Sequence, residues 1–115
     1  MTLTAEGGRI VSADVEIARS FLSKLLGLMF RKSFTGALIF DMGRETYDGI
    51  HMLFVYFPID VVFLDVDRRI VDVKENVRPW VGTAFPKSRF VYAIELPAGT
   101  IGRVGLKMGD QLTWS

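Results

Sequence analysis

The stretch from Ile50 to Asp65, IHMLFVYFPIDVVFLD, constrains the fold of this chain most strongly. Nearly all of its residues are apolar, and many are β-branched or aromatic, which suits a pleated and buried surface. Because Pro58 has no backbone N–H to donate to a β-ladder, the pattern predicts two strands, roughly Ile50–Phe54 and Val61–Asp65, with a bend between them. Neither strand alternates cleanly between apolar and polar residues, which predicts that both faces are covered.

A membrane-spanning helix is the rival interpretation of this stretch, and its acidic residues argue against it. A spanning helix needs about 20 largely apolar residues. Asp60 lies within the run, and an acid at the centre of a membrane costs about 2.5–3.5 kcal/mol on insertion scales. Charged residues follow at once, at Asp65, Asp67, Arg68 and Arg69. We therefore predict the core of a soluble domain and no membrane partner.

Length and composition predict a single globular domain spanning residues 1–115. Half of the residues are hydrophobic and 23% are charged, which is too apolar for a disordered chain. Fourteen basic residues against 13 acidic ones leave a net charge of +1, so bulk charge gives no support to a nucleic-acid partner. The chain has no cysteine and one histidine, which excludes disulfides, thiolate chemistry and multi-histidine metal sites within one chain. We expect neither a metal nor a cofactor.

The N-terminal segment, MTLTAEGGRIVSADVEIA, has no basic region followed by an apolar core. It does not match a secretory signal, so we expect a cytoplasmic protein.

Hydrophobic periodicity predicts about seven short strands and one helix. The alternation in Arg9–Ile17 predicts one half-buried strand or two short ones. Apolar residues at helical spacing from Ala18 to Met29 predict the one substantial helix, with Gly27 weakening its last turn. Further strands are expected at 36–42, 69–74, 90–96 and 111–114, and one helical turn is expected at 100–104.

The connections between these strands are short, which favours antiparallel neighbours. The polar segment GRETYDG at 43–49 has a glycine at each end and predicts a hairpin into the central stretch. Asp67 and Arg68 predict a turn, and the charged strand after them suits the outer edge of a sheet. We therefore expect a compact antiparallel α+β domain, mostly β, of barrel-like or sandwich-like form.

Three polar residues embedded in apolar segments are the candidate catalytic residues: His51, Asp60 and Glu95. His51 fits a general acid or base near neutral pH, or a histidine held by one hydrogen bond. Asp60 fits a site acid, or a structural acid that accepts backbone N–H groups at the bend after Pro58. Glu95 interrupts an apolar strand, and the guanidinium of Arg31 is a suitable partner for Glu95 or Asp60.

The segment from Val77 to Phe90 interleaves cations with Trp80 and Phe85. In some proteins that bind single-stranded nucleic acid, aromatic rings stack on the bases while cations contact the phosphate backbone. The alternative is that both aromatic side chains fold back over the core while the charges stay in solvent. We favour this alternative, and so expect no nucleic-acid partner.

Four segments, taken in order, give the chain a family resemblance. They are GLMFR at 27–31, GALIF at 36–40, HMLFVYFPIDVVFLD at 51–65 and IELPAGTIGRVGLKMGD at 94–110. Together they resemble the uncharacterised domain-of-unknown-function family numbered 192, small proteins of archaea and bacteria. The resemblance implies a single compact β-rich domain but no reaction. Many members carry Trp-Met where this chain has His51-Met52, so a family-wide catalytic role for His51 is not implied. The residues of the family pattern that suit a ligand-binding site are Arg31, Pro58, Asp60, Glu95 and Asp110.

Three functional interpretations follow, and they leave open whether the protein is an enzyme. We favour a domain that binds an unknown small molecule or peptide in a pocket near the bend at 58–60, rimmed by the glycine-rich segment 97–110. The second interpretation is a hydrolase that uses Asp60 or Glu95 together with His51. The third is a protein–protein interaction module that presents Trp80, Phe85 and Trp114 on one patch.

Overall fold

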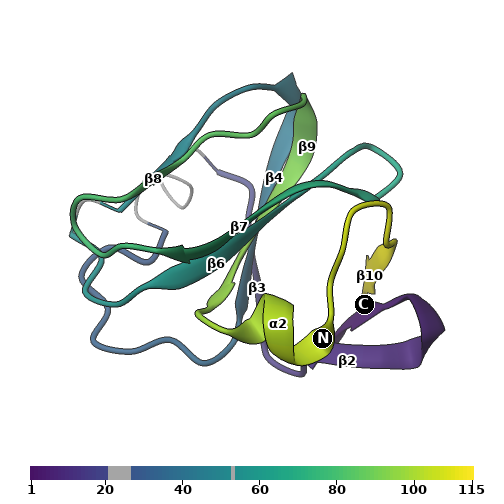
Figure 1. The fold of residues 1–115 in the computed structure, drawn as a ribbon, viewed down its shortest axis with the longest axis horizontal. Helices are drawn as coiled ribbons and strands as arrows, with labels where there is room; N and C mark the ends of the chain where they lie inside the picture. Colours follow the sequence, from purple (N-terminus) through teal and green to yellow (C-terminus); the bar gives the residue numbers. More distant parts are fainter. Residues whose placement is uncertain (21–26, 53) are drawn as a thin grey trace.

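A five-stranded sheet forms the centre of the molecule (Figure 1). The structure, a computed structural model, describes residues 1–20, 27–52 and 54–115. Within the sheet, β3 and β4 are parallel and all other neighbours are antiparallel. The strand order is β3 (Val15–Ala18), β4 (Ala37–Thr46), β9 (Phe90–Pro97), β6 (Ile59–Leu64) and β7 (Ile70–Val77).

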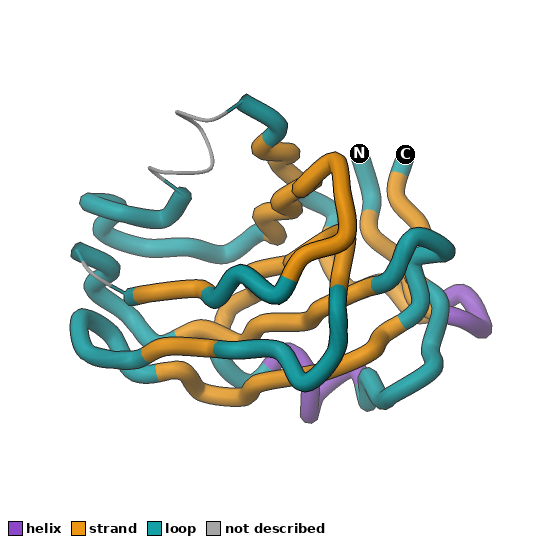
Figure 2. Tube along the Cα trace, turned by 90° about the horizontal axis from the view of Figure 1, so that it is seen from above, coloured by secondary structure: helices purple, strands orange, loops and turns teal. Residues whose placement is uncertain are grey.

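One face of this sheet is covered by a second, three-stranded sheet and a short helix. The second sheet has the order β10 (Leu112–Trp114), β1 (Leu3–Ala5) and β2 (Arg9–Ser12), with the 3-10 turn η1 (Glu6–Gly8) between β1 and β2. The helix is α2 (Thr100–Val104). Leu3, Ile101 and Leu112 bury their side chains here against Ile39 and Ile94 of the central sheet. The chain ends lie side by side on this flank (Figure 2).

The opposite face of the central sheet is covered by loops and by the small ladder of β5 (Ile50–His51) with β8 (Thr83–Ala84). Leu28, Met52 and Val55 come from these loops and pack on the sheet residues Phe40 and Phe63. The two faces therefore carry separate apolar clusters. This confirms the prediction, drawn from the unbroken apolar runs, that both faces of the sheet are covered.

Several predicted elements are confirmed. Arg9–Ile17 forms two short strands, the segment at 100–104 is helical, and β7 is an edge strand. The described strands leave the central sheet open at β3 and β7, so the fold is sandwich-like and not a closed barrel. Among the described residues, no helix has the length and apolar character that crossing a membrane requires.

Two predicted local structures are wrong. The segment at 43–49 is not a hairpin: β4 continues to Thr46 along β9, with a bulge after Asp41, and β5 pairs with β8. The strand predicted at 50–54 ends at His51, because the backbone of Met52 bonds to the loop containing Trp80 instead of continuing a ladder.

Half of the predicted helix at 18–29 falls outside the described residues. Ala18 is the last residue of β3, and residues 27–30 form a turn. The central part of the predicted helix, 21–26, is not among the described residues.

Candidate functional site

The candidate site lies on the loop-covered face of the central sheet. Strand register places one residue from each strand in a continuous row, because directly opposed residues of neighbouring strands point to the same face. From β3 to β7 the row reads Glu16, Leu38, Glu95, Val61 and Lys74. It sets a carboxyl group between two apolar side chains at the middle of the sheet.

Glu95 is the central polar residue of this row and is 5% exposed. Burial between Leu38 and Val61 raises the pKa of Glu95 to about 8, although the positive charge of Arg31 acts in the opposite direction. The Glu95 carboxyl is therefore mostly protonated at pH 7. A pKa displaced by burial in this way is common at functional sites.

The Glu95 carboxyl has no hydrogen-bond partner in the described ranges 1–20, 27–52 and 54–115, and only burial and Arg31 displace its pKa. Every fully enclosed side-chain oxygen or nitrogen among those residues does have a partner. The oxygens of Glu95 therefore lie where the small exposed fraction of the residue meets solvent. They form a polar point within an apolar surface, open to a molecule that offers hydrogen bonds.

Arg31 does not form the ion pair that its sequence context suggested. Its Nη1 and Nη2 atoms donate to the two carboxylate oxygens of Glu16 at 2.6 and 3.1 Å, whereas its charge reaches Glu95 only through space. The bidentate contact lowers the pKa of Glu16 and raises that of Arg31. Sequence reasoning missed Glu16 because the parallel β3–β4 pairing, which puts Glu16 in this row, had no local signal.

Asp60 has the structural role that was the alternative to a site acid. It is fully buried, and its carboxylate accepts hydrogen bonds from three backbone N–H groups, those of Asn76 at 2.9 Å, Gly99 at 3.1 Å and Ile101 at 2.9 Å. These bonds tie the end of β7 to the start of α2. Pro58 is exposed just before β6 and leads the chain into this arrangement.

The hydrolase interpretation requires residues that the fold separates. Asp60 is opposite Leu96 and Glu95 is opposite Val61, so the two carboxyl groups point to opposite faces of the sheet. His51 is exposed on the separate β5–β8 ladder. Asp60 and Glu95 therefore do not form a two-carboxylate site. Among the described residues, no three His, Cys, Asp or Glu side chains are grouped so as to hold a metal ion.

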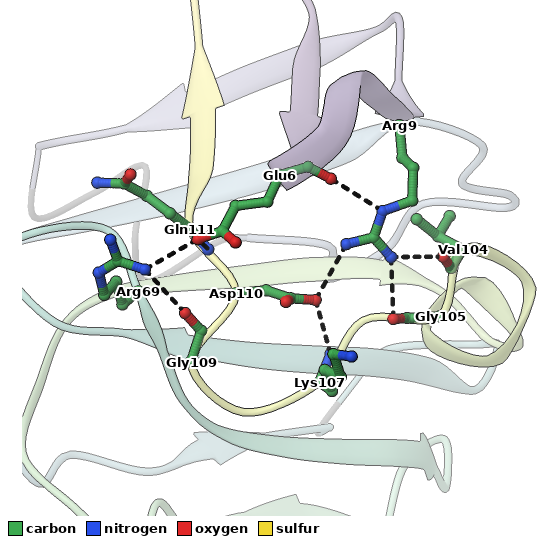
Figure 3. A network of polar contacts seen from close by, with 9 residues as sticks. All are labelled: Glu6, Arg9, Arg69, Val104, Gly105, Lys107, Gly109, Asp110 and Gln111. Carbon is green, nitrogen blue, oxygen red and sulfur yellow. Dashed lines mark hydrogen bonds and ion pairs between the residues drawn. The ribbon is translucent and has the colours of Figure 1, made fainter.

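Asp110 belongs to a polar network that joins the β1–β2 corner to the C-terminal segment (Figure 3). Its Oδ2 accepts hydrogen bonds from Arg9 Nη2 and from the backbone N–H of Lys107, both at 3.1 Å. Arg9 also donates to the carbonyl oxygens of Val104 and Gly105. In the same view, Arg69 donates to Glu6 and Gly109, and the Gln111 N–H also bonds to Glu6. Asp110 thus has a structural environment, remote from the face that carries Glu95.

The Asp110 network is expected to contribute acid-sensitive stability. Burial acts to raise the pKa of Asp110, but the hydrogen bonds and charges of Arg9 and Lys107 outweigh it and leave the pKa below its ordinary value. This contribution to stability is therefore complete above the pKa that Asp110 has in the unfolded chain. It is lost as the pH falls through the pKa that Asp110 has in the folded protein. Asp110→Ala should cost about 1–3 kcal/mol at pH 7, limited by the partial exposure of Arg9, and less at pH 3, below the ordinary pKa of 3.8. Urea unfolding at both pH values measures this, and an equal cost at both would contradict it.

A pocket of about 370 Å³ lies beside α2, formed by Phe34, Thr35, Arg103 and the segment 97–100. Pro97 is two residues after Glu95 in β9, and both residues point to the loop-covered face of the sheet. Phe34 packs against the apolar cluster on that same face. The glycine-rich segment predicted as a rim therefore does contribute to a pocket wall, through Gly99.

An aromatic surface, which we define as Phe30, Phe54, Tyr56 and Trp80, joins three loops near the site. Phe30 stacks on Phe54 with ring centroids 4.9 Å apart, and Trp80 contacts Phe54 and Tyr56 at 5.3 Å. Phe30, Phe54 and Trp80 have φ angles of 66°, 61° and 66°. A left-handed backbone costs a bulky residue about 1–3 kcal/mol, so the fold maintains this arrangement against local strain.

The structure corrects two expectations about the aromatic residues: that Trp80 and Phe85 fold back over the core, and that Trp114 shares a patch with them. Trp80 is 43% and Phe85 is 63% exposed, so neither folds back over the core. Trp114 lies elsewhere: it packs on Tyr92 of β9, and Arg68 stacks on its ring at 3.7 Å. The sequence did not distinguish Phe30 and Tyr56 as surface residues, because both lie in apolar runs that resemble core segments.

Comparison with known proteins gives the chain a family. The model of the family DUF192, described as "Uncharacterized ACR, COG1430", matches residues 1–114. A UPF0127 protein of Thermococcus sibiricus is 36% identical over 116 residues, which cover 99% of this chain and 74% of the relative. A UPF0127 protein of Pyrococcus horikoshii is 41% identical over 103 residues, covering 88% of this chain and 87% of the relative.

Two solved structures share the fold. A Novosphingobium aromaticivorans protein of unknown function has a TM-score of 0.87 and 26% identity, over 98% of this chain and 82% of that one. A Sinorhizobium meliloti protein, whose description proposes a transcription regulator, has a TM-score of 0.88 and 30% identity, over 97% of this chain and 89% of that one. The sequence resemblance noted above is thereby confirmed, and the chain belongs to the uncharacterised DUF192 (UPF0127) family.

Proposed function

We propose that this protein is a binding domain for an uncharged ligand that carries an amide group, either a small molecule or a peptide. The observation that supports the proposal is the Glu95 carboxyl, which is buried among apolar residues and has no hydrogen-bond partner in the described part of the chain. Solvent reaches this carboxyl only through the small exposed fraction of the residue. A ligand with matching hydrogen-bonding groups can replace that water while its apolar part covers the surrounding apolar surface.

The protonation state of Glu95 selects the ligand chemistry. With a pKa of about 8, the Glu95 carboxyl at pH 7 is neutral and presents an O–H donor beside a C=O acceptor. An amide offers the complementary acceptor and donor. Arg31 is already neutralised by Glu16, so the three groups together carry no net charge and do not favour a charged ligand.

The surroundings of Glu95 suit the apolar part of such a ligand. Leu38 and Val61 flank the carboxyl, and Phe34 and Pro97 extend the same face toward the pocket beside α2. That pocket, of about 370 Å³, is an open depression beside the face that carries Glu95, and Glu95 does not line it. Mostly apolar walls with few polar groups are typical of small-molecule sites.

The proposal is tested with a panel of N-acetyl amino-acid amides and the matching free acids and free amines, using ligand-observed NMR at pH 6.5 and pH 9. We expect saturation transfer to apolar amides at pH 6.5 and at least a fivefold weaker response at pH 9, because Glu95 then ionises. Glu95→Gln keeps a donor and an acceptor at every pH, so it should bind amides without the pH dependence. Glu95→Leu should lose binding.

The two Glu95 variants make the experiment decisive. Equal responses from the parent protein and Glu95→Leu would place any binding elsewhere. A response from the free acids that exceeds the response from the amides would refute the ligand chemistry. The absence of any response from the whole panel at pH 6.5 would reject an amide ligand at this site.

A further inference from the structure

We infer that the aromatic surface is a docking site for an acidic segment of a partner protein, anchored by an apolar or aromatic side chain. This inference is independent of the ligand proposed for Glu95. It rests on the convergence of three loops, on the exposure of their rings and on the charges around them.

Backbone hydrogen bonds fix the three loops against one another. The N–H of Phe30 donates to the carbonyl oxygen of Phe54 at 2.8 Å. The N–H of Trp80 donates to the carbonyl oxygen of Met52 at 3.0 Å, and the Met52 N–H donates to Gly82 at 3.1 Å. Side chains held on such a frame lose little conformational freedom when a partner binds, which favours affinity.

Three of the four rings of the aromatic surface are exposed, and the fourth, Phe54, is half-buried. Phe30 is 57%, Tyr56 is 47% and Trp80 is 43% exposed, and the neighbouring Val81 is 79% exposed. Each of the three loops holds one aromatic residue in the left-handed backbone region, where glycine is favoured, so the fold keeps these rings in place against local strain. Tryptophan and tyrosine are the residue types that dominate the affinity of protein interfaces.

The charges around the aromatic surface specify an acidic partner. The three loop segments, 27–36, 50–59 and 77–90, contain no Asp or Glu, although the chain has 13 of these residues. The exposed cations of these segments are Lys32, Arg78, Lys87 and Arg89. A partner with carboxylates beside its apolar anchor is complementary to this surface in both charge and hydrophobicity.

A protein partner fits these charges better than a nucleic acid. Binding a single strand requires a series of cations that follows the phosphate backbone. Here Arg31 is paired with Glu16, and Arg89 lies over the ring of Tyr47. The other exposed cations of the three segments are Lys32, Arg78 and Lys87, and the net charge of the chain is +1. A few cations around exposed rings are typical of a protein-binding hot spot.

The test is selection of random 12-residue peptides, displayed on phage, against the full chain, with counter-selection against Trp80→Gly. Glycine relaxes the left-handed backbone at this position, so Trp80→Gly removes the ring while the melting temperature stays within about 4 °C of the parent. We expect enriched peptides that combine an apolar or aromatic anchor with Asp or Glu. Their synthetic versions should bind at least tenfold more weakly to Trp80→Gly and to Phe30→Gly, and equally well to the control Val66→Ala, an exposed apolar residue elsewhere.

Charge reversal completes the test. Arg78→Glu should weaken the binding of the acidic peptides at least fivefold. It should strengthen the binding of copies in which every Asp and Glu is replaced by lysine. Enrichment of basic peptides, binding indifferent to Trp80→Gly, or no enrichment would overturn the inference. Labelled oligo(dT) that competes more strongly than the peptides would assign the aromatic surface to single-stranded nucleic acid instead. Self-association that Trp80→Gly abolishes would assign it to a second copy of the chain.

Discussion

Glu95→Gln is expected to stabilise the protein, and the gain should grow with pH. The parent must keep Glu95 protonated in the folded state up to a pKa of about 8, whereas the unfolded chain releases the proton near the ordinary value of 4.5. Between these values the folded state binds more protons, so the parent loses about 1.4 kcal/mol of stability per pH unit. Glutamine has the same shape and never ionises, so the variant does not share this loss.

The expected difference in unfolding free energy between Glu95→Gln and the parent is about 1 kcal/mol at pH 5 and about 4–5 kcal/mol at pH 9. Urea unfolding at each pH unit from 5 to 9 measures it. Glu16→Gln is the matched control, because the pKa of Glu16 is lowered by Arg31 and its contribution is constant across this range. A difference for Glu95→Gln that stays flat from pH 5 to pH 9 would show that Glu95 is ionised in the folded protein.

Asp60→Ala should be among the most destabilising single substitutions in the chain. Removing the carboxylate leaves three backbone N–H groups without their acceptor, at the junction of β7 and α2. Each unsatisfied donor costs about 1–3 kcal/mol, partly recovered by relaxation or entering water, so we expect a loss of about 3–5 kcal/mol at pH 7. Urea unfolding gives the loss, and hydrogen exchange should accelerate at the amides of Asn76, Gly99 and Ile101.

Asp67→Ala is the control for this prediction, because Asp67 is an exposed acid in a turn and its loss should cost less than about 0.5 kcal/mol. Asp60→Asn should have an intermediate cost, since one acceptor oxygen remains and an amide NH₂ then faces N–H donors. A cost for Asp60→Ala as small as that of the control would show that the three hydrogen bonds do not stabilise the fold.

The structural role of Asp60 limits what its variants can show about function. Gly99 contributes to the pocket wall and depends on Asp60 for its position, so loss of binding in an Asp60 variant would report on folding as much as on contact with a ligand. Glu95→Gln and Trp80→Gly are better probes. Glu95→Gln removes only the ability to ionise, and Trp80→Gly removes only the aromatic ring, while the backbone conformation at each position remains favourable. The first tests the site around Glu95 and the second tests the aromatic surface.

The sequence by itself determined the class of fold and most of the strands. Alternation in Arg9–Ile17, the apolar runs after Pro58 and before Pro97, and the short polar connections are local signals, and each produced a strand near the predicted place. The structural role of Asp60 also had a local signal, since an acid in an apolar strand beside a bend needs N–H donors. Family membership followed from motifs in order, for which no three-dimensional information was needed.

Only the tertiary structure decided which of these residues meet. The parallel pairing of β3 with β4 brings Glu16 into the row of Glu95 and gives Arg31 its partner, and strand register puts Asp60 and Glu95 on opposite faces. A shift of one residue in register would exchange these faces, and nothing within either strand specifies the register of its neighbour. The aromatic surface was hidden for a similar reason. The sequence marks Phe30, Tyr56 and Trp80 as apolar, but only the contacts among three distant loops decide whether a ring is buried or displayed.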